Sequence, residues 1–288
     1  MTRALLLLIP LAGTSTALAQ PEAVFKVQTR LVEVYATVRD SHGRYMDGLS
    51  RDRFQVSDNG EVQPVVAFES NASRLSCAIL IDTTGSMAAV LPVVKNSVVR
   101  LVDELRKEDE IGVFSFNTAL SRLQDFTTDK DAAKQAVLRT RAGGATALFD
   151  AISVLARDIS PRLGKKAIIV FTDGDDNASL LNARAAVQRS KKAGVPVYAI
   201  AEGDALKSNM LLNELKDVAE MTGGQSYEAR KTGEITAIFQ GISEDLQHTY
   251  MLAYKPPPSP GSKWRTIQLA VSGLKGAKIR AKEGYLPE

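Results

Sequence analysis

The sequence predicts a doubly wound α/β domain with a mainly parallel sheet, joined to a small β-sandwich formed by N- and C-terminal strands. Two observations predict this fold class. Residues 74–247 alternate short apolar runs with longer stretches of helical period, the pattern of parallel strands joined by helical crossovers. On either side, residues 24–70 and 250–281 alternate apolar and polar residues with a period of two, which is typical of half-buried strands.

Residues 1–19 have the features of a secretory signal peptide. Arg3 precedes an apolar run at residues 4–12, and small residues then lead to a cleavage site after Ala19. The apolar run is too short to span a bilayer. We therefore expect an exported protein of the periplasm, cell envelope or extracellular space, with no transmembrane segment after signal cleavage. An uncleaved anchor or a buried N-terminal helix is the alternative.

The segment at residues 20–73 contains strands and turns. Phe25 and Val27 belong to a first alternating run, and the parity changes after Leu31, which indicates a bulge or a break. Turn signals follow at residues 40–43 and 58–60, and the second predicts a hairpin.

The core at residues 74–247 supplies the α/β elements. Buried strands are expected at residues 75–81, 111–116, 167–171 and 195–201. Apolar residues recur at helical spacing over residues 90–105 and 235–246, and residues 121–127 fit an antiparallel edge strand.

The C-terminal segment at residues 248–288 returns to strands around a Pro-rich loop. Each terminal segment has too few strands to be stable alone, so we expect the two to pair into one sandwich with the α/β domain inserted between them. Two separate hairpin clusters on the sheet edges are the alternative.

Charge and cysteine content exclude several classes of partner and site. The chain has 36 basic and 33 acidic residues, and removal of Arg3 with the signal leaves 35 − 33 = +2. The basic residues are scattered, so neither nucleic acid nor an anionic membrane is expected as a partner. Cys77 is the single cysteine, and His42 and His248 lie far apart in sequence, so no zinc site is expected.

Three loops carry oxygen-bearing side chains: two end predicted strands, at the edge where open α/β sheets bind ligands, and the other, at residues 143–150, places a hydroxyl just before a helix. Together they offer only hard oxygen donors, which Mg²⁺, Mn²⁺ and Ca²⁺ prefer. Two carboxylates and three hydroxyls do not complete an octahedron, so we expect one place left for an outside ligand. The metal-ligand candidates are Asp82, Thr84, Ser86, Thr146 and Asp173.

These loops resemble the metal-ion-dependent adhesion site of von Willebrand factor type A domains, whose pattern is D-x-S-x-S, then a threonine, then an aspartate. The run DTTGS matches the first loop, Thr146 the second and Asp173 the third. The resemblance implies one divalent cation, Mg²⁺ first and Mn²⁺ or Ca²⁺ as alternatives, that holds an Asp or Glu of a protein partner. Thr84 departs from the serine of the pattern, keeping the hydroxyl but adding a methyl group that bears on ion preference.

Nearly the whole chain after the signal resembles a family of secreted A-domain proteins first described from acidobacteria. Six segments carry this resemblance: LVEVYATVRDSHGR, GLSRDRFQVSDNG, IDTTGSM, GGATALFDAI, IIVFTDGDDN and KIRAKEGY. It implies an adhesion or scaffolding role for the exported protein.

Four further residues are weaker candidates for partner-binding loops: Asn117, Asp175, Asp176 and Asn177. A solvated polar loop is the plainer interpretation of residues 175–177. Asp150 is expected in the first turn of its helix, near the free backbone amides there, and Thr146 alone would also suit a helix cap.

An enzyme can be built from the same residues. Asp82 or Asp173 beside a cation would suit a metal-dependent hydrolase, which is our alternative function. The three loops contain no histidine or lysine to act as a general base, and the chain contains no G-x-x-x-x-G-K-[ST] loop. We therefore expect no enzyme and assign no catalytic residue. A scaffold that has lost metal binding is a third interpretation.

Overall fold

The computed structural model of the protein describes residues 31–174, 176–258, 263–285 and 287. The predicted signal peptide at residues 1–19, the strand expected near Phe25, and Asp175 lie outside these residues. Among the described residues, no helix is both long and apolar enough to cross a membrane.

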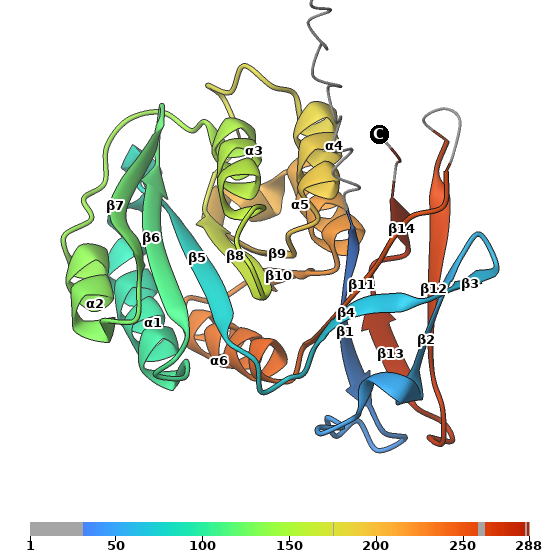
Figure 1. Cartoon of the computed structure of the whole chain (residues 1–288). Helices are drawn as coiled ribbons and strands as arrows, with labels where there is room; N and C mark the ends of the chain where they lie inside the picture. Colours follow the sequence, from blue (N-terminus) through green and yellow to red (C-terminus); the bar gives the residue numbers. More distant parts are fainter. Residues whose placement is uncertain (1–30, 175, 259–262, 286, 288) are drawn as a thin grey trace, which may run out of the picture.

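Within the described part of the chain, the central sheet has six strands in the order β10-β9-β8-β5-β6-β7 (Figure 1). All neighbours are parallel except β7, which runs antiparallel to β6 and confirms the expected edge strand. The strand order reverses beside β5, which is where such sheets bind ligands. The strands are β5 (Leu75–Asp82), β6 (Glu110–Phe116), β7 (Leu120–Thr127), β8 (Lys165–Thr172), β9 (Val197–Glu202) and β10 (Gln225–Ala229).

Helices cover both faces of this sheet (Figure 1). Alternate residues of β5 show why: Cys77, Ile79 and Ile81 pack under α1, α2 and α6, whereas Ala78 and Leu80 pack under α3, α4 and α5. A strand buried on both faces is apolar throughout, as predicted for a parallel sheet. The helices are α1 (Leu91–Glu104), α2 (Lys130–Leu138), α3 (Leu148–Ile159), α4 (Ala183–Ala193), α5 (Asn209–Thr222) and α6 (Glu234–Gln247), with 3-10 turns η1 (Arg51–Arg53), η2 (Gly85–Ala88) and η3 (Gly203–Lys207).

The strands outside the central sheet form a β-sandwich from both ends of the chain (Figure 1). In the described residues its two sheets have the orders β13-β1-β11-β4 and β14-β12-β2-β3, so N- and C-terminal strands pair directly in each, and both sheets contribute to one apolar core. The predicted fold class is confirmed. The strands are β1 (Val32–Arg39), β2 (Phe54–Asp58), β3 (Glu61–Gln63), β4 (Val65–Glu69), β11 (Tyr250–Tyr254), β12 (Arg265–Val271), β13 (Lys278–Ala281) and β14 (Gly284–Tyr285).

A buried carboxylate lies inside the sandwich, next to the predicted hairpin. Asn59 and Gly60 both have positive φ (50° and 84°), as a two-residue hairpin turn between β2 and β3 requires. The preceding Asp58 is fully buried, where it pairs with Arg265 Nε at 2.6 Å and accepts hydrogen bonds from the hydroxyls of Tyr254 and Tyr285. A carboxylate is tolerated in a core when it is paired with a cation and hydrogen-bonded, as Asp58 is here.

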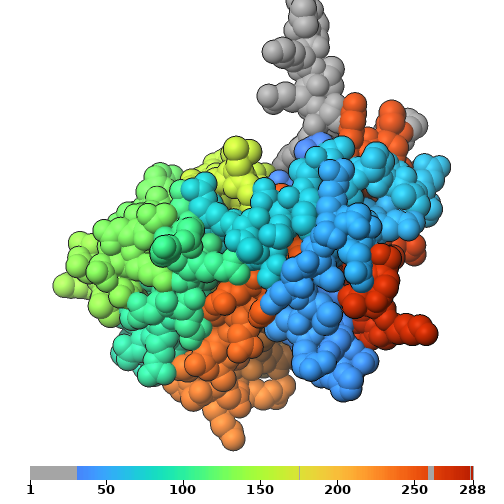
Figure 2. All heavy atoms as spheres, turned by 60° about the horizontal axis from the view of Figure 1, so that its bottom comes forward, coloured from blue at the N-terminus to red at the C-terminus, as the bar shows by residue number. Residues whose placement is uncertain are grey.

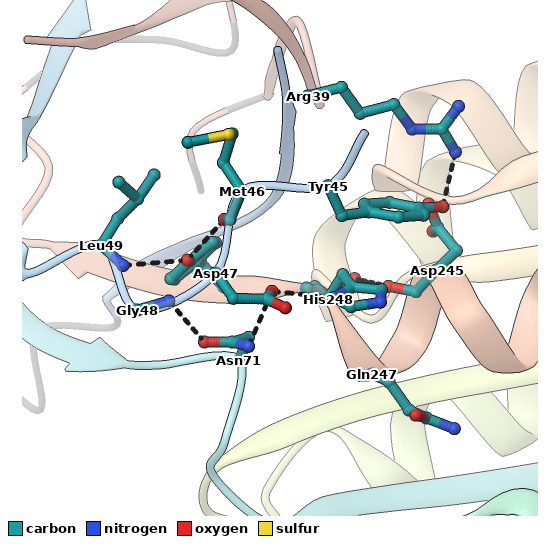
Figure 3. A network of polar contacts seen from close by, with 12 residues as sticks. Arg39, Tyr45, Met46, Asp47, Gly48, Leu49, Asn71, Asp245, Gln247 and His248 are labelled. Atoms are coloured by element: carbon teal, nitrogen blue, oxygen red, sulfur yellow. Dashed lines mark hydrogen bonds and ion pairs between the residues drawn. The ribbon is translucent and has the colours of Figure 1, made fainter. Parts of the chain in front are cut away.

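The sandwich and the α/β domain meet at a polar joint, which we define by Tyr45, Asp47, Asp245, His248 and Arg280. Figure 3 shows the first four of these residues. Asp245 of α6 is 2% exposed and accepts a hydrogen bond from the Tyr45 hydroxyl at 3.1 Å. Arg280 of β13 forms an ion pair with the same carboxylate. His248 stacks on the Tyr45 ring and bonds Asp47 at 2.7 Å, so this histidine is a joint residue rather than an ordinary surface residue.

Two buried lysines lie beside the joint. Lys165 Nζ donates to the backbone carbonyls of Asn71 and Thr249, the two connections between the domains, and Lys166 forms an ion pair with Glu33 at 2.8 Å. Burial lowers the pKa of Lys165 to about 8, and the charge of Arg106 acts in the same direction. Figure 2 brings the bottom of Figure 1 forward and shows the N-terminal β segment packed directly against the α6 region.

Candidate functional site

Asp82 ends β5 and is fully buried. Its Oδ1 accepts a hydrogen bond from the backbone N–H of Thr84 at 2.9 Å, and its Oδ2 accepts one from the hydroxyl of Thr172 at 2.8 Å. Burial raises the pKa of Asp82 to about 6, although these hydrogen bonds act in the opposite direction. A positive charge nearby would stabilise the ionised form, because burial is what disfavours it.

The hydroxyls of the first loop point toward the third loop. Thr84 Oγ1 lies 3.1 Å from Ser86 Oγ, which in turn donates to Asp173 Oδ1 at 2.9 Å. The structure therefore brings Thr84, Ser86 and Asp173 into one chain of hydrogen-bonded oxygens. Thr83 lies between Asp82 and Thr84 in the sequence but faces the other way. Its hydroxyl donates to the carbonyl of Phe116 at 3.0 Å.

Thr146 is buried in the second loop, which is fastened to the first. The backbone N–H of Gly143 donates to the carbonyl of Thr83 at 2.7 Å, and that of Gly85 donates to the carbonyl of Gly144. Thr146 does not cap α3, because the residue at the cap is Ala147. The cap interpretation of Thr146 is therefore wrong.

Three of the four residues proposed for partner-binding loops accept or donate hydrogen bonds that hold the second loop and the start of α3 in place. Asn117 Nδ2 donates to the carbonyl of Gly143 at 3.1 Å. Asn177 Oδ1 accepts the backbone N–H of Thr146, and Asp176 Oδ2 accepts that of Phe149, each at 2.9 Å. The fourth candidate, Asp175, lies outside the described residues.

Asp150 lies in the first turn of its helix, as expected, but it bonds other amides than expected. Its carboxylate accepts the backbone N–H groups of Leu180 and Leu181, at 2.8 and 3.0 Å, rather than amides of its own helix. The reason is that the loop after β8 folds over the start of α3, and the helix amide at Phe149 is already bonded to Asp176.

Ser86 and Asp173 line a pocket of about 270 Å³ together with residues that follow β9. Burial first, and then the charges of Asp173 and Asp204, raise the pKa of Glu202, which ends that strand. Burial likewise raises the pKa of Asp173. The pocket is electronegative and attracts cations. Sequence reasoning missed Glu202, although an acidic residue at the end of a buried strand was the available signal.

A larger hollow, of about 420 Å³, lies on the sandwich rather than near these loops. Its walls combine apolar residues of β2, β3 and β4 with Arg51 and Asp52. It brings together none of the candidate ligands.

The donor set of the three loops fits a hard divalent cation. All the side-chain donors are oxygens, and the Ser86 hydroxyl already lies within hydrogen-bonding distance of both the Thr84 hydroxyl and the Asp173 carboxylate. Among the described residues, no group of three or more His, Cys, Asp or Glu side chains could hold a metal. A cation at this site would therefore depend on hydroxyls as well as on carboxylates.

Two comparisons with known proteins each cover three quarters or more of the chain. A UPF0353 protein of Mycobacterium bovis is 22% identical over 253 residues, covering 75% of this chain and 74% of the relative. A solved von Willebrand factor type A protein from Catenulispora acidiphila superposes with a TM-score of 0.54 at 15% identity, covering 91% of this chain and 75% of that one. At this identity the likeness shows the fold alone.

The α/β domain by itself also has relatives of known structure. The protein BatB from Bacteroides thetaiotaomicron matches with a TM-score of 0.50 and 23% identity, over 59% of this chain and 98% of that one. Residues 77–241 match the family model of the von Willebrand factor type A domain. This match covers more than half of the chain, and the protein therefore belongs to the von Willebrand factor type A domain family.

Proposed function

We propose that this protein binds one divalent cation, Mg²⁺ first, at the loops after β5, α2 and β8, and uses it to hold an Asp or Glu of a protein partner. The hydrogen-bonded chain from Thr84 through Ser86 to Asp173 carries the proposal, because it gathers oxygen donors from two loops at the switch point of the sheet. Family membership supports it too, because these domains commonly serve adhesion or scaffolding through protein–protein contacts.

Each candidate ligand has a distinct task in this proposal. The hydroxyls of Thr84, Ser86 and Thr146 contact the cation, while Asp82 and Asp173 supply the balancing negative charge. Asp82 is well placed for this because two hydrogen bonds fix its carboxylate. A bound Mg²⁺ would supply a positive centre with a free coordination place for the partner's carboxylate.

We propose an extracytoplasmic location for this activity. Two proteins of similar fold support it: the pilus tip protein Mfa5 of Porphyromonas gingivalis, and an aerotolerance-related membrane protein of Bacteroides fragilis, both with a TM-score of 0.50. The signal-like residues 1–19 are consistent with export.

The cation is tested by titrating the purified protein with Mg²⁺, Mn²⁺ and Ca²⁺ while thermal unfolding is followed. An ion that binds only the folded state should add about 2.7 kcal/mol at a hundred times its Kd. For a chain of this size, this corresponds to a rise in Tm of roughly 5–10 °C. If none of the three ions raises the Tm, the proposal is wrong.

Two neighbouring threonines give a matched pair of variants. Thr84→Val removes a proposed ligand, so the ion-induced rise in Tm should shrink or vanish. Thr83→Val removes the same chemical group one residue earlier, where it only bonds the carbonyl of Phe116. The control should lose about 1 kcal/mol of stability and keep the full response to the ion. An equal loss of response in both variants contradicts the assignment.

The partner is tested by cross-linking and pull-down from the native envelope, with and without a chelator. A protein captured by the wild type, released by the chelator and not captured by Thr84→Val supports the proposal. The hydrolase alternative makes a different prediction: turnover of a phosphoester or peptide panel that Asp82→Asn abolishes.

A further inference from the structure

The loop after β8 is bonded to the start of α3 at both of its ends. We call residues 176–181 the clamp loop. At its near end Asp176 and Asn177 accept backbone N–H groups of Phe149 and Thr146, as described above. At its far end the direction is reversed, since Asp150 accepts backbone N–H groups of the loop itself. The side chains of Asp176 and Asn177 in the clamp loop, and that of Asp150 in α3, are thus the acceptors that fasten the loop to the start of the helix.

Asn177 of the clamp loop is hydrogen-bonded to both backbone polar groups of Thr146. Its side-chain Oδ1 accepts the backbone N–H of Thr146 at 2.9 Å, and its own backbone N–H donates to the carbonyl of Thr146 at 3.0 Å. The backbone N–H of Ala178 donates to the same carbonyl at 2.9 Å. Both backbone polar groups of Thr146 are therefore bonded to the loop that begins at Asp173.

The helix does not provide this positioning itself. The cap residue of α3 is Ala147, which has no side-chain acceptor for the first free amides. Asp176 supplies the missing acceptor for Phe149 from another loop, while the hydroxyl of Ser179 accepts the backbone N–H of Asp150 at 3.0 Å. The place of Thr146 relative to Asp173 is thus set by hydrogen bonds between the two loops rather than by the start of α3.

We propose that Asn177 is a positioning residue of the cation site. It fixes the position of the Thr146 hydroxyl relative to the oxygens of Ser86 and Asp173. This inference rests on the proposed function. Because Asn177 acts only through Thr146, its removal should weaken cation binding without changing the donor set. Partners that orient ligands in this way commonly contribute 10- to 100-fold to metal affinity.

The test measures Mn²⁺ affinity by isothermal titration calorimetry in the full-length protein. Asn177→Ala should weaken Mn²⁺ binding by about 10-fold or more. Thermal unfolding without ion shows whether the variant is folded, and Asn177→Ser takes its place if Asn177→Ala is not. Asp150→Ala is the matched control, because it breaks the far end of the clamp loop and leaves the bonds to Thr146 in place. Its Mn²⁺ affinity should stay within about threefold of the wild type.

A double-mutant cycle separates positioning from a general structural role. Thr146→Val removes the hydroxyl, so adding Asn177→Ala to it should cause no further loss of affinity. Asn177→Asp keeps the acceptor and should restore binding. The double variant Asn177→Ala, Leu180→Asp carries the same added charge without the acceptor, and it should not restore binding.

The outcomes distinguish the two proposals. A wild type that binds none of Mn²⁺, Mg²⁺ and Ca²⁺ overturns the proposed function. A wild type that binds, with an Asn177→Ala variant that binds equally well, overturns only the role of Asn177. Additive losses in the cycle with Thr146→Val also overturn that role.

Discussion

Replacing Arg280 by methionine should destabilise the joint between the two domains. Arg280 is the cationic partner of Asp245, which is 2% exposed, and its guanidinium also donates to the carbonyls of Gly223 and Gly224 at 2.7 and 3.0 Å. Without it, the partners that the carboxylate keeps among the described residues are the hydroxyls of Tyr45 and Tyr198. A buried charge that has lost its counter-charge is strongly destabilising.

The magnitude follows from burial. Removing one member of a buried ion pair costs about 3–5 kcal/mol. The Arg280 side chain is 30% exposed, so water can reach part of the site and the lower end, about 3 kcal/mol, is expected. For a chain of this size, that loss lowers the Tm by roughly 6–12 °C.

The assay is urea and thermal unfolding followed by circular dichroism. Arg230→Met is the matched control, because the pair of Arg230 with Glu228 is exposed and its loss should change stability by at most about 0.5 kcal/mol. Adding Asp245→Asn to Arg280→Met removes the stranded charge and should recover part of the loss. A decrease below about 1 kcal/mol for Arg280→Met, or no recovery with Asp245→Asn, would refute the reasoning.

Three further substitutions test other parts of the fold. Between pH 8 and 10.5 the unfolded chain keeps the Lys165 proton that the folded protein releases, so stability should rise by about 3 kcal/mol across this window, and Lys165→Met should flatten the rise in a series of urea unfolding curves. Gly224→Ala should prevent folding, seen as loss of soluble protein, because a Cβ there would lie 2.0 Å from the carbonyl oxygen of Val197. Gly241→Ala should add about 0.5–1 kcal/mol in the same unfolding assay, because its α6 site is open.

For each of these three predictions, one result would contradict it. A pH profile of Lys165→Met parallel to that of the wild type means that Lys165 does not lose its proton early. Soluble, cooperatively unfolding Gly224→Ala protein means that the backbone at β9 can move aside. A destabilised Gly241→Ala variant means that packing around α6 is tighter than its surroundings indicate.

The elements that the sequence predicts well are those with strong periodic patterns. The apolar run of β5 and the helical spacing in α1 and α6 each appear where expected, because burial on both faces or on one stripe dictates the residues used. The strand β10 is missed, because its sequence QSYEA is largely polar and only partly buried. The periodic signal comes from burial, so a half-buried edge strand leaves little of it.

The sequence predicts which residues form the candidate site, but not which residues hold its loops in place. The positions of Thr84, Ser86 and Asp173 follow from turns at strand ends, and the structure brings their oxygens together. The roles of Asp176 and Asn177 could not be predicted, because an Asp or Asn that accepts backbone amides inside the protein has the same local sequence as one in a solvated loop. Likewise, the pairing of Asp58 with Tyr285 depends on contacts between distant segments.

The two connections between the domains lie side by side, which decides how mechanical tension would travel through the molecule. Strands β4 and β11, which lead into and out of the α/β domain, are hydrogen-bonded neighbours, with Glu69 opposite Met251. A pull exerted on the loops at the far edge of the central sheet therefore reaches the sandwich through two covalent paths at a single place. The ladder between β4 and β11 shares that load, so one path cannot be drawn out without shearing its bonds to the other.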